Sequence, residues 1–370
     1  MPVRDADVVV IGGGAMGSAA AWQLAARGAD VVLLERFAPG HTRGASHGAS
    51  RIFRLAYPDS VYIGLARQAE ALWRELEDVS RTDLLTITGG VSHGRGPELG
   101  RVAPALEAAG LAAERLSHEE AVERWPGLRF EGEILHLPHT GRLHADKAVS
   151  ALQTTAAKLG AVVRHETPVT GIETHGEQDV SVHTIERSYR ARTVVVAAGA
   201  WTHTLLDGLV PLPPLRVTQE QPAHFASIRA DLTWPAFSHH FDPAGTGYPS
   251  GTYGLATPGE GVKVGFHGVG PEVHPDRRDF TPEPGQLQAL RAYVHEWLPG
   301  LDPDGCAPIS CTYTTTPTSD FVLDRHGPIV VAAGFSGHGF KFTPVIGRIL
   351  ADLATTGQRP DTRFAWAGTP

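Results

Sequence analysis

The first 35 residues consist of two apolar runs separated by glycines and an alanine-rich segment. Residues 8–11 (VVVI) are all β-branched, with no polar alternation, which predicts a strand buried on both faces. Residues 19–27 predict a helix that Gly28 ends. Residues 31–34 (VVLL) predict a second buried strand, and Glu35 follows it directly. This order predicts a βαβ unit with an acidic residue at the tip of its second strand.

The same texture returns twice further along the chain. Residues 144–173 predict a helix that Gly160 ends and then a strand, and a predicted hairpin (VSVHTIERSYRART) leads to the buried strand VVVAAGAW at 194–201. Residues 327–357 again predict a strand, a glycine loop and a helix. Residues 86–143 and 212–318 differ, because short alternating runs such as GVKVGFHG are typical of an antiparallel sheet.

The glycines of the first loop follow the spacing Gly12-x-Gly14-x-x-Gly17. After a strand and before a helix, this spacing allows a sharp turn, close approach of a pyrophosphate and tight helix packing. N–H groups at the helix start attract a diphosphate, and the Glu35 carboxylate can accept hydrogen bonds from ribose hydroxyls. A turn without a cofactor is the alternative. Because a glutamate disfavours a 2′-phosphate, the pattern leaves FAD and NAD open.

The late strands bear on that choice and on the domain organisation. Glutathione-reductase-like flavoproteins return to the FAD site with strands ending in small residues, as at Ala198-Gly199 and Ala333-Gly334, although small residues follow buried strands in many α/β proteins. We therefore predict an α/β fold of two domains (α+β in overall organisation). A discontinuous Rossmann-type FAD-binding domain spans 1–85, 144–211 and 319–370, and an inserted antiparallel-sheet substrate domain spans 86–143 and 212–318. A substrate would lie between them.

Composition narrows the functional classes. The 370 residues can bury a large core and should form two domains. The 32 Lys and Arg against 40 Asp and Glu give a net charge of −8, which argues against a nucleic-acid surface. No apolar run has the length of a membrane span, and the N-terminal residues leave no room for a signal peptide. Two cysteines suit a reducing cytoplasm. Since the 19 histidines form no metal-ligand spacing, we predict no metal.

Five segments in order carry a family resemblance: GASHGASRIFRLAY (44–57), ERWPGL (123–128), VKVGFHG (262–268), SCTYTTTP (310–317) and AAGFSGHGFKFTP (332–344). With them the chain resembles the FAD-dependent amine oxidases of the D-amino-acid oxidase and glycine oxidase superfamily, in particular the monomeric sarcosine oxidases and N-methyltryptophan oxidases. The resemblance covers essentially the whole chain. It implies oxidation of a secondary-amine amino acid by FAD, with O₂ reduced to H₂O₂, by a protein that is expected to be a monomer.

The resemblance also implies cofactor contacts. Cys311 matches a cysteine that bonds covalently to the flavin 8α carbon, whereas a buried small hydrophobe is the ordinary fate of a free cysteine. Cys306 is interpreted as structural. Backbone N–H groups of Gly337, His338 and Gly339 are expected near the flavin pyrimidine. The full set of expected cofactor-binding residues is Gly12, Gly14, Met16, Gly17, Glu35, Arg36, Ser46, His47, Arg51, Val169, Ala198, Gly199, Trp201, Cys311, Gly337, His338, Gly339 and Lys341.

The same resemblance implies catalytic and substrate-binding residues. Arg54 and Lys341 match a pair that binds the substrate carboxylate, with Tyr253 beside the pocket. Lys263 matches a lysine that assists O₂ reduction, and His267 matches a histidine that orients the amine. Arg51 completes the expected catalytic set, near the flavin. Without the family match, these cations would be interpreted as solvated surface side chains.

One region departs from the family pattern. Residues 233–251 (TWPAFSHHFDPAGTGYPSG) match the sarcosine enzymes poorly. In 251–261 (GTYGLATPGEG), Tyr253 stands beside Thr252 where the family often has a tyrosine pair, and the register carries a gap. The carboxylate-binding end therefore resembles the family, while the side-chain end of the pocket differs, which favours a substrate other than sarcosine. An N-carboxymethyl amino acid cleaved to glyoxylate, a flavin dehydrogenase with another electron acceptor, and a non-catalytic nucleotide-binding sensor are the alternatives.

Overall fold

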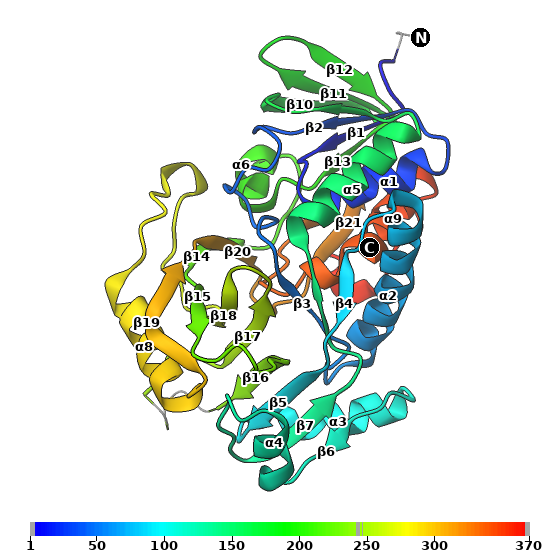
Figure 1. Cartoon of the computed structure of the whole chain (residues 1–370). Coiled ribbons are helices and arrows are strands. Elements are labelled where there is room, and N and C mark those ends of the chain that lie inside the picture. The colour runs from blue at the N-terminus through cyan, green and yellow to red at the C-terminus, as the bar shows by residue number, and fades with distance from the viewer. Residues whose placement is uncertain (1–3, 242–244, 246, 367–370) are drawn as a thin grey trace.

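A six-stranded sheet forms the centre of the computed structural model, which describes residues 4–241, 245 and 247–366 (Figure 1). The strand order is β21-β22-β13-β1-β2-β9, parallel except for the edge strand β21. The strands are β1 (Val8–Ile11), β2 (Val31–Leu34), β9 (Val162–Arg164), β13 (Thr193–Val196), β21 (Val322–His326) and β22 (Ile329–Ala333). The predicted α/β fold class with a Rossmann-like parallel sheet is confirmed.

Two layers cover this sheet, and β1 shows how the sequence fills both. Val8 and Val10 pack into the core shared with the helices, while Val9 and Ile11 pack toward the three-stranded sheet on the other face. Every residue of β1 is therefore buried, as its unbroken apolar run predicts. The helical layer consists of α1 (Ala15–Ala25), α2 (Ser60–Ser80), α5 (Ala145–Lys158) and α9 (Thr343–Thr355), and the opposite sheet consists of β10 (Val169–Gly176), β11 (Asp179–Thr184) and β12 (Ser188–Ala191).

The structure corrects three expectations about these elements. Helix α1 begins at Ala15 rather than at residue 19, because Gly17 belongs to the helix and packs on the loop before it. The strand predicted over 194–201 ends at Val196 and gives way to η1 (Gly199–Trp201) and α6 (Thr202–Leu206). The long amphipathic helix α2 was not predicted, although Asp59 caps it with hydrogen bonds from Val61 N and Tyr62 N.

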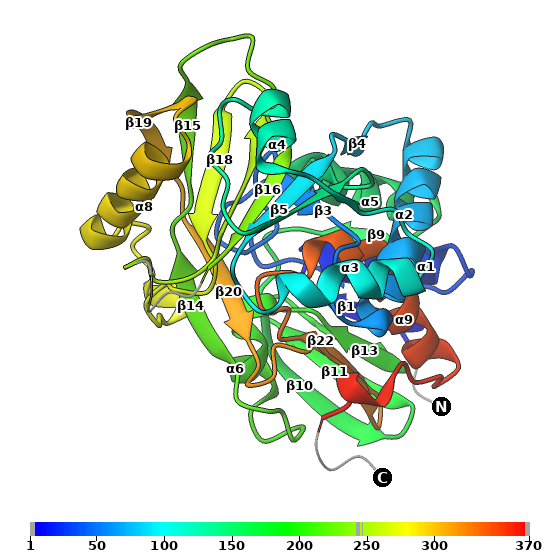
Figure 2. The ribbon, with the colours of Figure 1, turned by 90° about the horizontal axis from the view of Figure 1, so that it is seen from below.

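An eight-stranded sheet forms the second large unit, in the order β19-β15-β18-β17-β16-β5-β7-β6. Its strands pair antiparallel except for β5 and β16. Helix α8 lies against one face, as the view from below shows (Figure 2). The elements are β5 (Gly90–Gly94), β6 (Glu114–Arg115), β7 (Glu133–Leu137), β15 (Ala223–Ser227), β16 (Ala236–His240), β17 (Thr252–Thr257), β18 (Gly261–Phe266), β19 (Leu301–Pro308) and α8 (Pro284–Trp297).

Strand β18 has side chains of opposite character on its two faces. Val262, Val264 and Phe266 pack in the core with α8, so Lys263 and Gly265 face the other way, toward the central sheet. The antiparallel arrangement predicted for GVKVGFHG is therefore present. Its alternation gives one face for packing and one for chemistry.

Shorter elements connect the two large sheets. Strands β4 and β8 hydrogen-bond to each other across the expected domain boundaries near residues 85 and 143, and β8 also pairs with β3. Strand β14 pairs with β20 between the two large sheets. These strands are β3 (Arg51–Phe53), β4 (Leu85–Ile87), β8 (Gly141–Leu143), β14 (Arg216–Glu220) and β20 (Cys311–Thr315). Further helices of the described residues are α3 (Leu99–Ala108), α4 (His118–Arg124), η2 (Pro275–Arg277), η3 (Phe340–Phe342) and η4 (Thr362–Phe364).

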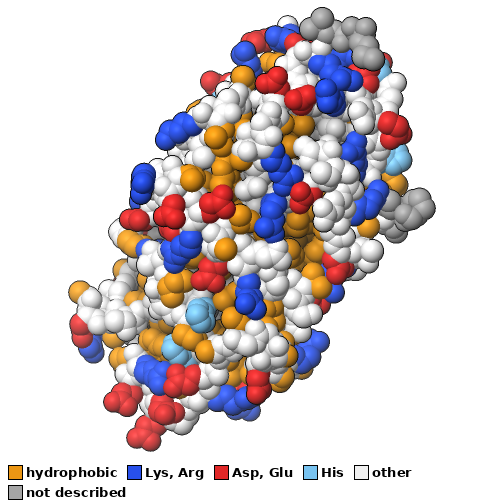
Figure 3. All heavy atoms as spheres, turned by 90° about the vertical axis from the view of Figure 1, so that its right-hand side faces the viewer, with side chains coloured by type: hydrophobic (Ala, Val, Ile, Leu, Met, Phe, Trp, Pro, Cys, Tyr) orange, Lys and Arg blue, Asp and Glu red, His pale blue; other side chains and the backbone are white. Residues whose placement is uncertain are grey.

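The outer surface adds little specific chemistry on the face viewed from the right-hand side of Figure 1. There, lysine and arginine side chains are interspersed with aspartate and glutamate (Figure 3). Among the residues that the structure describes, the helices lack the combination of length and apolar character needed to cross a bilayer. The site described next lies inside the molecule.

Candidate active site

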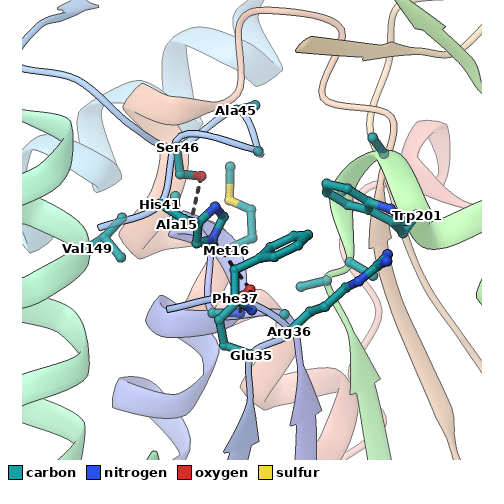
Figure 4. A pocket seen from close by; sticks show the side chains of 18 of the residues that line it. Ala15, Met16, Glu35, Arg36, Phe37, His41, Ala45, Ser46, Val149 and Trp201 are labelled. Carbon is teal, nitrogen blue, oxygen red and sulfur yellow. Dashed lines mark hydrogen bonds and ion pairs between the residues drawn. The ribbon is translucent and has the colours of Figure 1, made fainter. Parts of the chain in front are cut away.

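A cavity of about 780 Å³ begins at the glycine loop and is lined by segments from the whole length of the chain. Of the expected cofactor-binding residues, those that line it are Gly12, Gly14, Met16, Glu35, Arg36, Ser46, Arg51, Val169, Ala198, Gly199, Trp201, Cys311, Gly337 and Gly339. The other four, Gly17, His47, His338 and Lys341, are not among its lining residues. Figure 4 shows the end nearest the glycine loop, where the rings of Phe37 and Trp201 lie close to the Arg36 side chain.

The glycine loop is shaped by close backbone contacts. Gly12 has φ +102°, a conformation that favours glycine, and a Cβ there would lie 2.4 Å from the Ala197 oxygen. A Cβ on Gly17 would lie 1.9 Å from the Gly12 oxygen, so Gly17 sits behind the loop and lets the helix approach it. The N-cap residue of α1 is Gly14, which has no side chain that could cap the helix. Apart from Ala15 N, which donates to Ser46 Oγ at 3.0 Å, its first N–H groups have no side-chain cap and lie beside the cavity.

Glu35 lies where the sequence placed it, at the end of β2 and beside this loop. Its carboxylate accepts hydrogen bonds from Gly13 N at 2.6 Å and Phe37 N at 2.8 Å, and His41 Nε2 lies 3.4 Å away. Burial raises the pKa of Glu35, but the hydrogen bonds from His41, Phe37 and Gly13 outweigh burial and keep the pKa below its ordinary value. The ionised carboxylate retains acceptor capacity for a ligand in the cavity.

Arg51 and Lys263 meet at one backbone oxygen. Lys263 Nζ donates to the Ser50 oxygen at 2.7 Å, and Arg51 Nη1 donates to the same oxygen at 2.8 Å. Lys263 comes from β18 and is only 4% exposed. Burial of its ammonium group lowers the pKa to about 7, and the positive charge of Arg51 adds to this effect, while the charge of Cys311 acts in the opposite direction. Lys263, Arg51 and Cys311 therefore share one electrostatic neighbourhood.

Arg54 and Lys341 meet at a tyrosine. Lys341 Nζ donates to Tyr57 Oη at 2.9 Å and to the His338 oxygen at 2.7 Å. The Arg54 guanidinium lies 5.5 Å from the centre of the Tyr57 ring, and its Nη1 donates to Ser238 Oγ at 3.1 Å. Burial lowers the pKa of Lys341 well below its ordinary value, and the neighbouring Arg54 lowers it further. The two cations expected to act together are therefore brought together.

His267 lies near both of these cations and next to an aromatic group. Its Nδ1 is 3.5 Å from Tyr313 Oη, and the two ring centres are 5.3 Å apart. His267 is an exposed residue, but the protein atoms around its ring desolvate it and lower its pKa to about 4, and repulsion from Arg54 and Lys341 adds to the shift. His267 is therefore a neutral hydrogen-bonding group at neutral pH.

Tyr253 and Tyr313 form an aromatic wall beside His267. The Tyr253 ring extends over Gly265, where an added Cβ would meet its hydroxyl at 2.8 Å. Tyr313 packs on Gly337, since a Cβ there would lie 2.2 Å from the Tyr313 ring. The pKa of Tyr313 is raised because its hydroxyl is buried and close to Tyr253. Tyr313 lines the cavity, so the wall borders the space that begins at the glycine loop.

Comparison with known proteins decides the family. A family model described as FAD dependent oxidoreductase matches residues 7–353. The chain belongs to this family. It is 35% identical over 369 residues to the monomeric sarcosine oxidase of Bacillus sp. (strain NS-129), covering 95% of this chain and 93% of the relative. It is 30% identical over 363 residues to the N-methyl-L-tryptophan oxidase of Citrobacter koseri, covering 94% of each.

A solved structure agrees with this assignment. NikD, described as an unusual amino acid oxidase essential for nikkomycin biosynthesis, superposes with a TM-score of 0.88 at 28% identity, covering 98% of both chains. The family resemblance inferred from the five sequence segments is thus confirmed, and the protein is a flavoprotein oxidoreductase. The comparisons do not favour the non-catalytic sensor alternative.

The cavity fits FAD on structural grounds. The glycine loop and the N-terminus of α1 suit a diphosphate, and Glu35 suits a ribose. Near Cys311, the atoms His47 Nε2, Ser310 Oγ and Arg278 Nε and Nη1 are buried without hydrogen-bond partners in the described part of the chain. His47, Ser310 and Arg278 do not line the cavity, so the fit rests on the glycine loop, the N-terminus of α1 and Glu35. Within the same part of the chain, no cluster of three or more metal-ligating side chains was found.

Several residues of the site were not predicted from the sequence. Tyr57 stands three residues after Arg54 in the quoted segment FRLAY, and its spacing from Arg54 was the available signal. Tyr313 lay within CTYTTTP, but was not assigned a role. Asp276, which lines the cavity and accepts hydrogen bonds from Arg36 and Trp201, had no signal, because its partners are distant in sequence. Residues 242–244 and 246 of the divergent segment 233–251 lie outside the described residues.

Proposed function

We propose that this protein is an FAD-dependent oxidase of N-substituted α-amino acids. The enzyme oxidises the substrate to an imine, which then hydrolyses, and O₂ is reduced to H₂O₂ as the flavin is reoxidised. One observation carries this proposal: Arg54 and Lys341 converge on Tyr57, next to His267 and the cavity-lining Tyr313. The names of the sarcosine and N-methyl-L-tryptophan oxidase relatives support the same substrate class.

The two cations suit a carboxylate. Holding the buried Lys341 beside the half-buried Arg54 is unfavourable in the free protein, as the lowered pKa of Lys341 indicates. A bound carboxylate would relieve this repulsion and would raise that pKa. The planar guanidinium can donate two parallel hydrogen bonds, and the ammonium adds a compact charge. Binding energy from this end would hold the α-carbon in a fixed position.

His267 and Tyr313 suit the amine. A neutral imidazole can accept a hydrogen bond from the substrate nitrogen, and its low pKa keeps it from competing as a cation. The repulsion from Arg54 and Lys341 would likewise disfavour a protonated amine, so the site favours the neutral amine. FAD, when bound, would supply the acceptor for the two electrons and the hydrogen of the C–H bond next to that nitrogen.

Lys263 suits the reaction with oxygen. Reduction of O₂ develops negative charge, which a fixed ammonium stabilises in a dry site. Lys263 is buried and is held by the Ser50 oxygen beside Arg51. With a pKa of about 7, it can be cationic at neutral pH and can also release its proton. This role distinguishes an oxidase from a dehydrogenase that uses another acceptor.

We also propose that Cys311 attaches FAD covalently. Cys311 is a free cysteine on β20, lines the cavity, and lies in the electrostatic neighbourhood of Lys263 and Arg278. Acid precipitation of the purified protein tests this proposal: flavin should stay with the protein pellet and should be released to the supernatant in Cys311→Ser. Release from the wild type would contradict the covalent link.

The proposed domain organisation, 1–85, 144–211 and 319–370 against 86–143 and 212–318, assigns the glycine loop to one part and Lys263 and His267 to the other. We also propose that the protein acts as a monomer and that its location is cytoplasmic, in keeping with two free cysteines. Light scattering after size-exclusion chromatography tests the monomer, because a mass near 39.4 kDa is expected.

Two measurements test the activity. Anaerobic mixing with N-methyl and cyclic imino acids should bleach the flavin spectrum, and readmitted air should restore the spectrum with one H₂O₂ for each substrate consumed. Absence of bleaching by every N-substituted amino acid would contradict the substrate class. Bleaching that air reverses only slowly, while an artificial electron acceptor reverses it fast, would identify a dehydrogenase instead.

A further inference from the structure

Ser238 and His240 are polar residues at one end of the eight-stranded sheet, on the face that carries Lys263. They alternate with Phe237 and His239 along β16, and these last two face α8, where Phe237 joins the core and His239 contacts Tyr293. Ser238 and His240 therefore face the opposite side, the side of Lys263. They belong to the segment that departs from the sarcosine oxidase pattern, so this end is where the substrate preference of this chain can differ.

The strand register places His240 in one row with His267. His239 pairs with Thr252, so His240 stands opposite Gly251, and His267 N donates to the Gly251 oxygen at 3.2 Å. On the other side, His240 pairs with Gly94. Both neighbours of His240 in this row are glycines. Among the described residues, only the Gly251 backbone stands between the two histidines in this row, and a Cβ there would meet only the His239 oxygen at 3.1 Å. Two strand spacings hold the backbones of the two histidines roughly 9–10 Å apart.

Ser238 links this row to the carboxylate-binding cations. It stands opposite Tyr253 on β17, and its Oγ accepts the hydrogen bond from Arg54 Nη1. Because the hydroxyl oxygen is already an acceptor there, its O–H remains to donate. The His240 ring has no hydrogen bond or ion pair within the described ranges 4–241, 245 and 247–366, and it is partly exposed. Two neutral donors thus lie beside the guanidinium.

The lysine and arginine that act on the two imidazoles from this side of the sheet are Arg54 and Lys341. The groups that shift the pKa of His267 are Arg54 and Lys341, and burial lowers the pKa of His240 to about 4 with Arg54 and His239 adding to the shift. None of these groups is a carboxylate. One α-carboxylate bound by Arg54 and Lys341 would balance only one of their two positive charges. The hydrogen-bond donors of Ser238 and His240 lie near Arg54, where a second anion could balance the other charge.

We propose that Ser238 and His240 select N-substituted amino acids whose side chain carries a second carboxylate. This inference rests on the proposed oxidase function and names its substrate class. The second carboxylate would occupy the glycine-floored gap over Gly251, with Ser238 and His240 donating hydrogen bonds and Arg54 shared between the two acidic groups. A side-chain carboxamide has the same shape without the charge, which makes it the matched comparison.

The test compares the kcat/KM for N-methylaspartate and N-methylasparagine, and for N-methylglutamate and N-methylglutamine, in the FAD-loaded full-length protein. We expect the acid to exceed its amide by about 10- to 100-fold, since hydrogen bonds to charged groups are the strong ones. His240→Phe and Ser238→Ala should reduce this ratio several-fold through KM, and His240→Gln should restore part of it. His295→Phe, on the exposed side of α8, is the control and should leave the ratio unchanged.

The outcomes separate this inference from the proposed function. Acid and amide oxidised equally well, or a ratio that His240→Phe and Ser238→Ala leave intact, would overturn the second-carboxylate site while the oxidase function stands. If no N-methyl amino acid yields H₂O₂ or bleaches the flavin, the proposed function itself fails. A loss of flavin content in a variant would indicate misfolding. In that case the Kd values of succinate and butyrate, measured by flavin absorbance in the wild type, are compared instead. Equal affinities for the two acids would overturn the inference.

Discussion

The cofactor cavity and the substrate end are built in different ways. The cavity near the glycine loop is formed mainly by backbone atoms. Gly12 and Gly17 make backbone contacts too close for any side chain, and the first N–H groups of α1 lie beside the cavity. The substrate end relies on side chains from distant segments, with Arg54 following β3, Lys341 in η3 and His267 after β18. In the first region close backbone contacts determine the shape of the cavity, while in the second region we propose that charged side chains bind the substrate.

The largest effect is expected where the backbone contact is tightest. Gly17→Val should abolish FAD retention in the purified full-length protein, because its Cβ would lie 1.9 Å from the Gly12 oxygen and would force α1 away from the loop. Flavin absorbance per protein measures this. Gly64→Ala in α2 is the control, since nothing lies within 4 Å of a Cβ there. Normal flavin content in Gly17→Val would show that the loop is not the anchor we describe.

Removing one substrate cation should have a smaller and more selective effect. Lys341→Met should raise KM for an oxidised amino acid by about 10- to 100-fold, the cost of one charged hydrogen bond, ~1.5–3 kcal/mol. Flavin content should stay near that of the wild type, because the cavity near the glycine loop does not contain this side chain. An unchanged KM for every active substrate would remove Lys341 from the carboxylate site.

The oxygen reaction should depend on pH through Lys263. The pKa of Lys263 is lowered to about 7, so the cation is present below this pH and is lost as the pH rises through it. Reoxidation of the reduced enzyme by O₂ should therefore slow above about pH 7, by up to 10-fold, and Lys263→Met should be slow at every pH. Stopped-flow mixing with O₂ measures the rate. The prediction fails if Lys263→Met keeps the wild-type rate and profile.

The smallest effect concerns a side-chain contact within the cofactor cavity. Asp276 pairs with Arg36 at 2.8 Å and accepts a hydrogen bond from Trp201 Nε1 at 2.9 Å. Both members of the ion pair are nearly half exposed, so the pair contributes only about 0–1 kcal/mol. In a Cys311→Ser background, Asp276→Asn should weaken FAD binding about two- to fivefold by titration, while Asp279→Asn should not. A larger loss would mean that the cofactor end also depends on side chains.

The same difference explains what the sequence could reveal. Glycine spacing, buried strands and Glu35 are local patterns, so the position of a dinucleotide-binding loop could be predicted from 35 residues, although the choice between FAD and NAD could not. The convergence of Arg54, Tyr57 and Lys341 depends on how β3 and η3 meet in space, which no local pattern encodes, and family resemblance supplied the pairing. The roles of Ser238 and His240 required the strand register, because their neighbours Gly94 and Gly251 lie far away in sequence.

Small errors in the predicted elements have a similar origin. Glycine and alanine after β1 were interpreted as loop, whereas the close packing of Gly17 lets α1 begin at Ala15. The apolar run after Val196 was interpreted as strand, although Gly199 adopts φ +54° and turns the chain toward the cavity. In both places the ligand-binding loop, rather than local preference, determines where the element ends.

The carboxylate-binding role of Arg54 and Lys341 is tested most directly by a crystal structure of the FAD-loaded protein with a simple carboxylate such as propionate bound. The account predicts that the carboxylate oxygens lie within hydrogen-bond distance of both Arg54 and Lys341, beside the flavin ring and with His267 facing the substrate carbon chain. A propionate that binds elsewhere, or a flavin ring far from these two cations, would contradict it.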